Sequence, residues 1–432
     1  MARPARRPGR QAQVTGLLVI GWGVAALVNM NACASVGAPP GGPPDTMPPH
    51  IVAVHPDSGA MVPNFKGDAV IQFDEVIEEM AGGGGAGGSQ LEKLVMLSPV
   101  AGPVRVGWHR TSISVKPREG WKRRVYRLEV LPGIYDLRRN HLDTAKTVLF
   151  STGPEIGHAR IGGIALHWID QHIVARALIE AVPLPDSVGY LTLADSGGQF
   201  NLESLAPGRY TVYATQDENG DRRRNPREAY DSIMVTVDSS TNVALYLFPH
   251  DTTPPRPRQA TFVDSLTVRV DFSQSLDPTQ SFDTAHVHVV ELPDSTPVPV
   301  ARIFTARLYD SLTTAERQKQ DSAAAAARDT GAARRPPPPP PPPPRAQAQG
   351  KKPAGPVVDT ALVRRLLARR PIPSDKIIVR MARPLKTEAR YVVRVQDATN
   401  LVGKKGEGLV GFLVPKPTPV DTTHRAPRRS RP

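Results

Sequence analysis

Short apolar runs separated by turn-forming residues are the feature that most restricts what this chain can fold into. The runs at residues 69–73, 94–97 and 125–131 are separated by stretches rich in Gly, Pro, Asp and Ser. Runs of this length are typical of the strands of a β-sandwich. The composition agrees, because 46 prolines and 35 glycines among 432 residues suit turn-rich modules better than one large α/β enzyme. We therefore predict an all-β chain of tandem β-sandwich domains joined by disordered linkers.

The N-terminal segment predicts export. Four arginines precede an apolar run at residues 14–28: Arg3, Arg6, Arg7 and Arg10. A basic start followed by an apolar stretch too short to span a bilayer as a stable helix is typical of a secretory signal, here residues 1–33. The Pro- and Gly-rich stretch that follows, residues 34–47, is expected to be a solvated tether.

The end of this signal resembles a bacterial lipoprotein cleavage site, where removal of the signal leaves an acylated cysteine at the N-terminus. Cys33 is the only cysteine of the chain, so no disulfide can form within it. Ala32 suits the resemblance, whereas Asn31 and Met30 depart from the small and leucine-like residues usual there. The resemblance implies lipidation of Cys33 and a membrane partner. The alternatives are an ordinary secretory signal cut near Ala32 or Ala34, and an uncleaved anchor.

Residues 48–153 resemble the bacterial Ig-like domain family of surface-layer proteins and lipoproteins. The resemblance is carried by Pro48-Pro49-His50-Ile51-Val52, Pro56-Asp57-Ser58-Gly59-Ala60, Val70-Ile71-Gln72-Phe73-Asp74-Glu75, Tyr126-Arg127-Leu128-Glu129-Val130 and Phe150-Ser151-Thr152-Gly153. In the closing segment, Asp136 matches an aspartate of the family. These motifs are structural, so the resemblance implies a fold rather than an activity.

The same pattern recurs later in the chain and predicts a second, divergent Ig-like domain at residues 254–415. Thr253-Pro254-Pro255 parallels Met47-Pro48-Pro49, and Tyr391-Val392-Val393-Arg394-Val395 parallels the strand at residues 126–130. A low-complexity insertion, residues 311–373, interrupts this copy. It contains an expected exposed helix at 313–328, opened by the capping box Thr313-Thr314-Ala315-Glu316, and a polyproline run at 336–344. A basic disordered tail, residues 416–432, is expected to follow.

Between the two copies, residues 158–248 resemble the prealbumin-like, carboxypeptidase-regulatory type of β-sandwich. The resemblance rests on Gly198-Gln199-Phe200-Asn201-Leu202 and on Leu205-Ala206-Pro207-Gly208-Arg209-Tyr210-Thr211-Val212-Tyr213-Ala214. Pro207-Gly208 predicts a tight turn. Tyr210, Val212 and Ala214 alternate onto one face of the strand that follows.

The strongest candidate for chemistry follows that strand. Asp217, Asn219, Asp221 and Glu228 stand at positions one, three, five and twelve of a loop, which is the spacing of oxygen ligands for calcium. Two features depart from an EF-type loop, because glycine comes one step before Asp221 instead of one step after, and residues 222–224 are three arginines. The alternative is a polar, Asx-rich turn between strands.

No catalytic motif is present in the sequence. It contains neither a Gly-x-Ser-x-Gly elbow nor His-Glu-x-x-His. The histidines are scattered, and His286-x-His288 is expected on the exposed face of a strand. We therefore expect a protein that is not an enzyme and has no cofactor other than the candidate calcium ion.

The net charge of +13 raises the question of polyanionic partners. No stacking aromatics or reader fold accompany the basic residues, so nucleic acid is not expected. An exported protein meets anionic lipids and envelope polysaccharides instead. We expect an outer-membrane or surface lipoprotein of the cell envelope that acts as a non-catalytic structural or adhesive module. The alternative is a calcium-stabilised surface glycan-binding lipoprotein, which Trp108, Trp121 and Trp168 permit; a third is a hydrolase with an unrecognised site.

Overall fold

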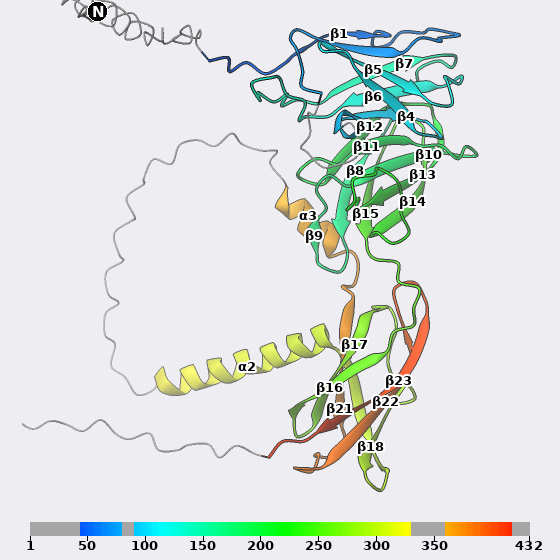
Figure 1. The fold of residues 1–432 in the computed structure, drawn as a ribbon. Helices are drawn as coiled ribbons and strands as arrows, with labels where there is room; N and C mark the ends of the chain where they lie inside the picture. The colour runs from blue at the N-terminus through cyan, green and yellow to red at the C-terminus, as the bar shows by residue number, and fades with distance from the viewer. Residues whose placement is uncertain (1–43, 80–89, 330–358, 417–432) are drawn as a thin grey trace, which may run out of the picture. The chain divides into compact units, whose positions relative to one another are not determined.

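The computed structural model describes residues 44–79, 90–329 and 359–416 (Figure 1). Cys33, the polyproline run and the C-terminal tail lie outside these ranges. The chain separates into Met1–Met47 and a compact unit, Pro48–Pro432. The described strands all lie in the second unit and form three β-sandwiches, which we call the first, middle and third. The predicted all-β fold class is confirmed.

The first sandwich has the strand order of an immunoglobulin constant-type domain. Its strands are β1 Ile51–His55, β2 Ala69–Phe73, β3 Val95–Ser98, β4 Val104–Trp108, β5 Ser112–Pro117, β6 Val125–Val130 and β7 Lys146–Ser151, with the short helix η1 Gln90–Lys93 before β3. Lettered A to G, they form one sheet in the order A-B-E-D and a second in the order C-F-G. The core between the sheets includes Ile71, Ile113, Leu128 and Phe150.

The third sandwich repeats this order. Its strands are β16 Pro257–Asp264, β17 Thr267–Leu276, β18 Val287–Leu292, β19 Thr296–Val298, β20 Val300–Thr305, β21 Ser374–Met381, β22 Arg390–Thr399 and β23 Lys405–Leu413. The sheets run β16-β17-β21-β20 and β19-β18-β22-β23, which is A-B-E-D and C-F-G with one extra strand, β19, at an edge. The repeated sequence pattern therefore corresponds to a repeated topology.

Each sandwich also contains a buried tyrosine that is bonded to backbone a few residues upstream. Tyr126 near the start of β6 accepts the Lys122 N–H at 2.7 Å, and Tyr391 near the start of β22 accepts the Lys386 N–H at 2.9 Å. Strands β6 and β22 both hold the F position, where immunoglobulin-type sandwiches place such a tyrosine corner. In the middle sandwich, the hydroxyl of Tyr210 donates to the Ala206 carbonyl at 2.7 Å.

The middle sandwich has a different topology. Its strands are β8 Ala159–His167, β9 His172–Ile173, β10 Leu178–Pro183, β11 Tyr190–Leu193, β12 Gln199–Leu205, β13 Gly208–Thr215, β14 Tyr230–Val237 and β15 Ser240–Leu247. One sheet runs β11-β10-β13-β14 and the other β12-β8-β15, with β9 paired to β8. Strand β15 pairs with β8 in parallel, whereas the other pairs are antiparallel. As predicted, Tyr210, Val212 and Ala214 of β13 are buried in the core.

Two helices lie between β20 and β21 of the third sandwich: α2 Ala306–Asp329 and α3 Thr360–Leu367. Helix α2 begins directly after β20, so the prediction that a capping box opens it at Thr313 is wrong. The Thr313 hydroxyl lies inside the helix and bonds back to the carbonyls of Tyr309 and Asp310 at 3.0 and 3.1 Å. Helix α3 has a clear N-cap, because the carboxylate of Asp359 accepts the N–H groups of Ala361 and Leu362.

Helix α3 packs on the middle sandwich rather than on the third. Leu366 and Leu367 are buried against Ile164, Leu166 and Tyr246 of β8 and β15. The Tyr246 hydroxyl also donates to the Leu366 carbonyl at 2.8 Å. Val363 packs against the same cluster, whereas Leu362 is 40 % exposed.

Candidate functional site

The predicted calcium residues lie in one loop, residues 216–229, which connects β13 to β14. The base of the loop is closed by the Gln216 N–H, which donates to the Ala229 carbonyl at 2.8 Å. Strands β13 and β14 are paired along their whole length, from Gly208 opposite Val237 to Thr215 opposite Tyr230. The two ends of the loop are therefore held together by the antiparallel pairing of β13 and β14.

Side-chain oxygens shape the first half of the loop. Asp217 accepts the Gly220 N–H at 2.8 Å through Oδ1 and the Arg222 N–H at 2.9 Å through Oδ2. The amide oxygen of Asn219 accepts the Asp221 N–H at 2.7 Å, and Asp221 in turn accepts the Arg223 N–H at 2.8 Å. The contacts of Asn219 and Asp221 are Asx turns, which the polar-turn alternative also predicts. Each of these oxygens keeps a second lone pair for a further partner.

Glu228, at the end of the loop, is the unusual residue. It is only 7 % exposed, and its Oε2 has no hydrogen-bond partner. Burial raises the pKa of this carboxyl, and the nearby carboxylates of Asp217 and Asp221 raise it further, while the N–H groups of Glu218 and Asn219 act in the opposite direction. The side chain is therefore held by backbone N–H groups from the first half of the same loop.

Two of the three arginines that seemed to oppose a cation site, Arg222 and Arg224, have partners of their own. Arg222 donates from Nη1 to the Val95 carbonyl of the first sandwich at 3.0 Å, and burial lowers the pKa of its guanidinium to about 10. Arg224 lies over the ring of Tyr213, 3.8 Å from its centroid. The Asp217 carboxylate, one of the predicted ligands, also acts on Arg222 and raises the pKa of its guanidinium against the effect of burial.

A second group of possible ligands was not predicted from the sequence. His167 and His172 face each other across the β8–β9 hairpin, with ring centroids 5.0 Å apart, and Asp170 lies in the turn between them. Their ligand atoms come within 4.8 Å of one another, and His167 Nδ1 is 3.1 Å from Asp170 Oδ2. Burial lowers the pKa of His167, which favours the neutral imidazole that a metal binds. Two imidazoles and a carboxylate suit a divalent transition metal, although the Asp170 N–H already donates to His167 Nδ1 at 3.2 Å.

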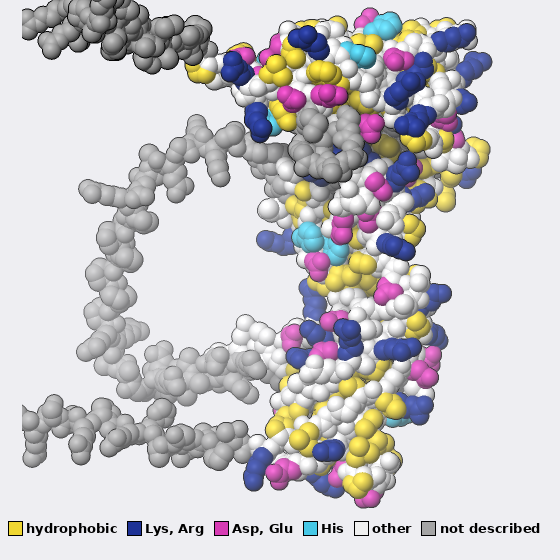
Figure 2. All heavy atoms as spheres, in the orientation of Figure 1, with side chains coloured by type: hydrophobic (Ala, Val, Ile, Leu, Met, Phe, Trp, Pro, Cys, Tyr) yellow, Lys and Arg dark blue, Asp and Glu magenta, His cyan; other side chains and the backbone are white. Residues whose placement is uncertain are grey.

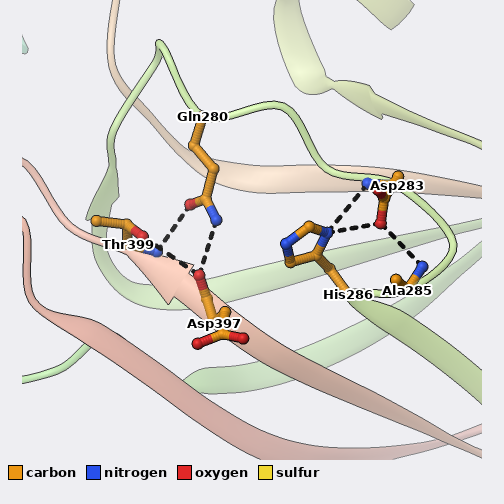
Figure 3. A network of polar contacts seen from close by, with 6 residues as sticks. All are labelled: Gln280, Asp283, Ala285, His286, Asp397 and Thr399. Carbon is orange, nitrogen blue, oxygen red and sulfur yellow. Dashed lines mark hydrogen bonds and ion pairs between the residues drawn. The ribbon is translucent and has the colours of Figure 1, made fainter.

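Of the two histidines expected on an exposed strand face, only His288 lies there. Strand β18 begins at Val287, so His286 lies in the preceding turn while His288 is exposed on the strand. Figure 3 shows the reason, since His286 Nδ1 is bonded to the Asp283 carboxylate at 2.7 Å. In the same region Gln280 bridges the backbone of Asp397 and Thr399, at 2.7 and 2.8 Å. Both contacts hold a loop in place and do not form a metal pair.

The three tryptophans considered for glycan stacking use their indole N–H groups internally. Trp108 donates to the Ile77 carbonyl, Trp121 to the Gly67 carbonyl, and Trp168 to the Pro371 carbonyl. Trp121 also packs against Tyr126 and Phe150 in the first core, with ring centroids 4.9 and 5.4 Å away. Their positions in two different sandwiches do not form a continuous aromatic strip.

The region between the first and middle sandwiches contains buried polar contacts. Arg127 Nε lies 3.3 Å from Glu129 Oε2, and both side chains are at most 10 % exposed. The hydroxyl of Thr192 on β11 donates to the same carboxylate oxygen at 3.2 Å, and the Leu191 N–H donates to Ser98 Oγ at 3.0 Å. Strands β6 and β11 thus share a desolvated polar network.

Comparisons with known proteins assign no family to this chain. No family model matches the chain, and no curated protein matches it. Among solved structures, it is similar to the major pilin subunit BcpA of Bacillus cereus, at 9 % identity and a TM-score of 0.16 over 46 % of this chain and 70 % of that one. It is also similar to the Bacillus anthracis TIE protein, at 9 % identity and a TM-score of 0.16 over 60 % of this chain and 48 % of that one. A third similar structure is the S-layer protein rSbsC, at 9 % identity and a TM-score of 0.17 over 85 % of this chain and 54 % of that one. Likeness at these TM-scores carries no argument about this chain.

Proposed function

We propose that this chain is an exported, non-catalytic structural or adhesive module of the cell envelope, held to a membrane by an acylated Cys33. The observation that carries the proposal is the shared network between the first and middle sandwiches. An ion pair and a hydroxyl are desolvated there, between strands of successive sandwiches. Burying such groups is unfavourable unless their partners stay in place, so the contact favours a fixed spacing between modules. A fixed spacing suits a spacer or scaffold.

The membrane part of the proposal rests on Cys33 alone. No helix within the described ranges is both long and apolar enough to cross a bilayer. A diacylglyceryl group on Cys33 would supply the attachment. A diacylglyceryl group carries two acyl chains, which is enough for stable anchoring, and the basic residues of the chain would add an attraction to anionic head groups.

Adhesion to an envelope polysaccharide or another anionic polymer is the proposed secondary role. On the face shown in Figure 2, Lys and Arg side chains are interspersed with Asp and Glu rather than gathered in one patch. Such a surface favours weak, salt-sensitive contact over a specific site. We prefer this role to glycan recognition by stacking, because Trp108 and Trp121 lie in the first sandwich and Trp168 lies in the middle one, so they form no continuous aromatic strip.

The test is intact-mass analysis of the N-terminal peptide from membrane-fractionated native protein, with Cys33→Ala in parallel. A diacylglyceryl mass on Cys33, together with loss of the variant from membranes, is the expected result. A salt wash separates the two attachments, because an acylated protein stays in the pellet while ionic contact is released. An unmodified N-terminus in the soluble fraction would overturn the anchor.

A further inference from the structure

We propose that the β8–β9 hairpin of the middle sandwich binds one zinc ion through His167, Asp170 and His172. His167 is the last residue of β8, His172 is the first residue of β9, and Asp170 lies in the turn that joins the two strands. One ligand atom from each of the three residues lies within 4.8 Å of the other two. A single hairpin supplies all three residues, so the site does not depend on how the sandwiches are arranged.

The backbone of the hairpin brings the two histidines together. His167 and His172 are directly paired across the strands, so their side chains lie on the same face, with ring centroids 5.0 Å apart. The Gln171 N–H donates to the His167 carbonyl at 3.0 Å, and Gln171 has a left-handed φ of 56°. These two features close the chain into a tight turn. Two imidazoles bound to one zinc ion have ring centres about 5 Å apart, so the spacing set by the backbone suits the ion.

The contact between His167 and Asp170 points to a cation. The Asp170 N–H donates to His167 Nδ1 at 3.2 Å, so this nitrogen carries a lone pair and no hydrogen. Asp170 Oδ2 lies 3.1 Å from the same nitrogen, and a carboxylate oxygen also offers only lone pairs. Two acceptors at this distance repel each other unless a proton or a metal ion lies between them. A proton is disfavoured, because His167 is only 7 % exposed and burial favours the neutral imidazole.

A zinc ion fits between these two atoms. Zinc binds imidazole nitrogen and carboxylate oxygen at about 2.0–2.2 Å, so ligand atoms 3.1 Å apart subtend roughly a right angle at the ion. The ion takes the place of the Asp170 N–H at His167 Nδ1, a neutral hydrogen bond that contributes only about 1 kcal/mol. His172 is exposed, and its ring turns toward the ion to supply the third ligand atom.

The chemistry of the donors favours zinc over the hard cations. Calcium and magnesium are bound mainly by oxygen, whereas imidazole suits zinc and other divalent transition metals. Zinc also has no geometric preference from its d electrons, so it accepts a site whose angles are set by a hairpin. Three protein ligands leave the fourth position of a tetrahedral ion to water.

The ion also acts on the docking of α3. Trp168 and Ile173 of the hairpin pack against the cluster that contains Leu366 and Leu367. The indole N–H of Trp168 also donates to the Pro371 carbonyl, at 3.1 Å, and Figure 1 shows β9 next to α3. An ion that closes the hairpin holds Trp168 and Ile173 in position. Zinc should therefore make the opening of α3 less frequent.

The experiment is isothermal titration of zinc chloride into full-length protein that carries no histidine tag and has been treated with EDTA and desalted. We expect one equivalent of zinc to bind and the unfolding temperature to rise, as for any ligand that binds only the folded state. Calcium or magnesium at the same concentration should give neither effect. Tryptic cleavage after Arg364 and Arg365 should become slower in zinc, and mass spectrometry would measure the rate.

Two variants and one matched control locate the site. His172→Ala and Asp170→Asn should each weaken zinc binding by about tenfold or more, whereas His288→Ala, which removes an exposed histidine of the third sandwich, should leave it unchanged. Asp170 and His172 are exposed, so these variants test the site even if His167→Ala fails to fold. Absence of zinc binding by the folded wild-type protein would overturn the proposal, and so would unchanged affinity in His172→Ala. An unchanged cleavage rate at saturating zinc would overturn the effect on α3.

Discussion

Tyr126 and Tyr391 are equivalent residues of the first and third sandwiches. Each is 1 % exposed near the start of the F strand, and each hydroxyl accepts a backbone N–H from four or five residues upstream. The two sandwiches thus share a side-chain device as well as a strand order. The tyrosine ring fills the core while its hydroxyl fixes the chain that enters the strand.

Removing either hydroxyl should destabilise its own sandwich. Tyr126→Phe and Tyr391→Phe each leave a backbone N–H without its acceptor, and a loss of about 1–2 kcal/mol is expected in the transition of the affected sandwich. Scanning calorimetry of the full chain would measure this. Tyr309→Phe on α2 serves as the control, because that residue lies outside the sandwiches. Equal effects of all three substitutions would contradict the prediction.

Stability should fall at high pH through Tyr210. Burial raises the pKa of this hydroxyl from 10.0 to about 12. The unfolded chain therefore loses its proton first, so the stability contributed by the neutral hydroxyl is complete below pH 10 and is lost as pH rises from 10 to 12. Two pKa units correspond to about 2–3 kcal/mol.

The pH prediction is checked with Tyr210→Phe. Thermal unfolding followed by circular dichroism should show a smaller loss between pH 10 and 12 in the variant than in the unmodified protein. At neutral pH the variant should be the less stable of the two, because its hydrogen bond to the Ala206 carbonyl is gone. Parallel pH curves for the two proteins would show that Tyr210 does not control the transition.

Glu129→Gln should weaken the contact between the first and middle sandwiches. The substitution leaves the buried Arg127 without its counter-charge, and breaking a buried pair from one side costs about 3 kcal/mol. Urea unfolding followed by tryptophan fluorescence would measure this loss of stability. Glu407→Gln, on an exposed position of β23, is the matched control. The double variant Arg127→Met with Glu129→Leu should lose less than Glu129→Gln alone, and a larger loss would refute the account.

The docking of α3 can be tested by proteolysis. Leu366→Ala with Leu367→Ala removes the buried part of its contact with β8 and β15, so local opening should become about tenfold more frequent or more. The readout is the rate of tryptic cleavage after Arg364 and Arg365, followed by mass spectrometry. Leu362→Ala should leave the rate unchanged, because Leu362 is already 40 % exposed. An equal acceleration in both variants would argue against docking.

The sequence predicted features that depend on local pattern. Alternation along β13 placed Tyr210, Val212 and Ala214 on the core side, and the repeated Pro-Pro and Tyr-Val motifs indicated two related sandwiches. Features that depend on distant contacts were missed. The spacing of Arg127 and Glu129 is that of a solvated strand face, and only packing against β11 buries them. Thr313 fits a capping box, yet helix α2 continues straight from β20.

The candidate sites, too, could be predicted only as far as local sequence spacing shows them. The spacing of Asp217, Asn219, Asp221 and Glu228 suggested a cation loop, but the buried free oxygen of Glu228 is visible only in three dimensions. His167 and His172 stand five residues apart in a segment without an Asn-Gly or Asp-Gly turn signal. Nothing in that pattern shows that a hairpin brings their rings together.

The place of α2 and α3 in the third sandwich has a consequence for the order of folding during synthesis. Strand β21 lies between β17 and β20 in its sheet, yet it enters the chain only after both helices. The sheet therefore cannot close until residue 374 and those after it have been synthesised, and until then β17 and β20 lack their shared partner. Closing a longer loop adds only about 0.6 kcal/mol for each doubling of its length, so the insertion delays assembly far more than it weakens the finished domain.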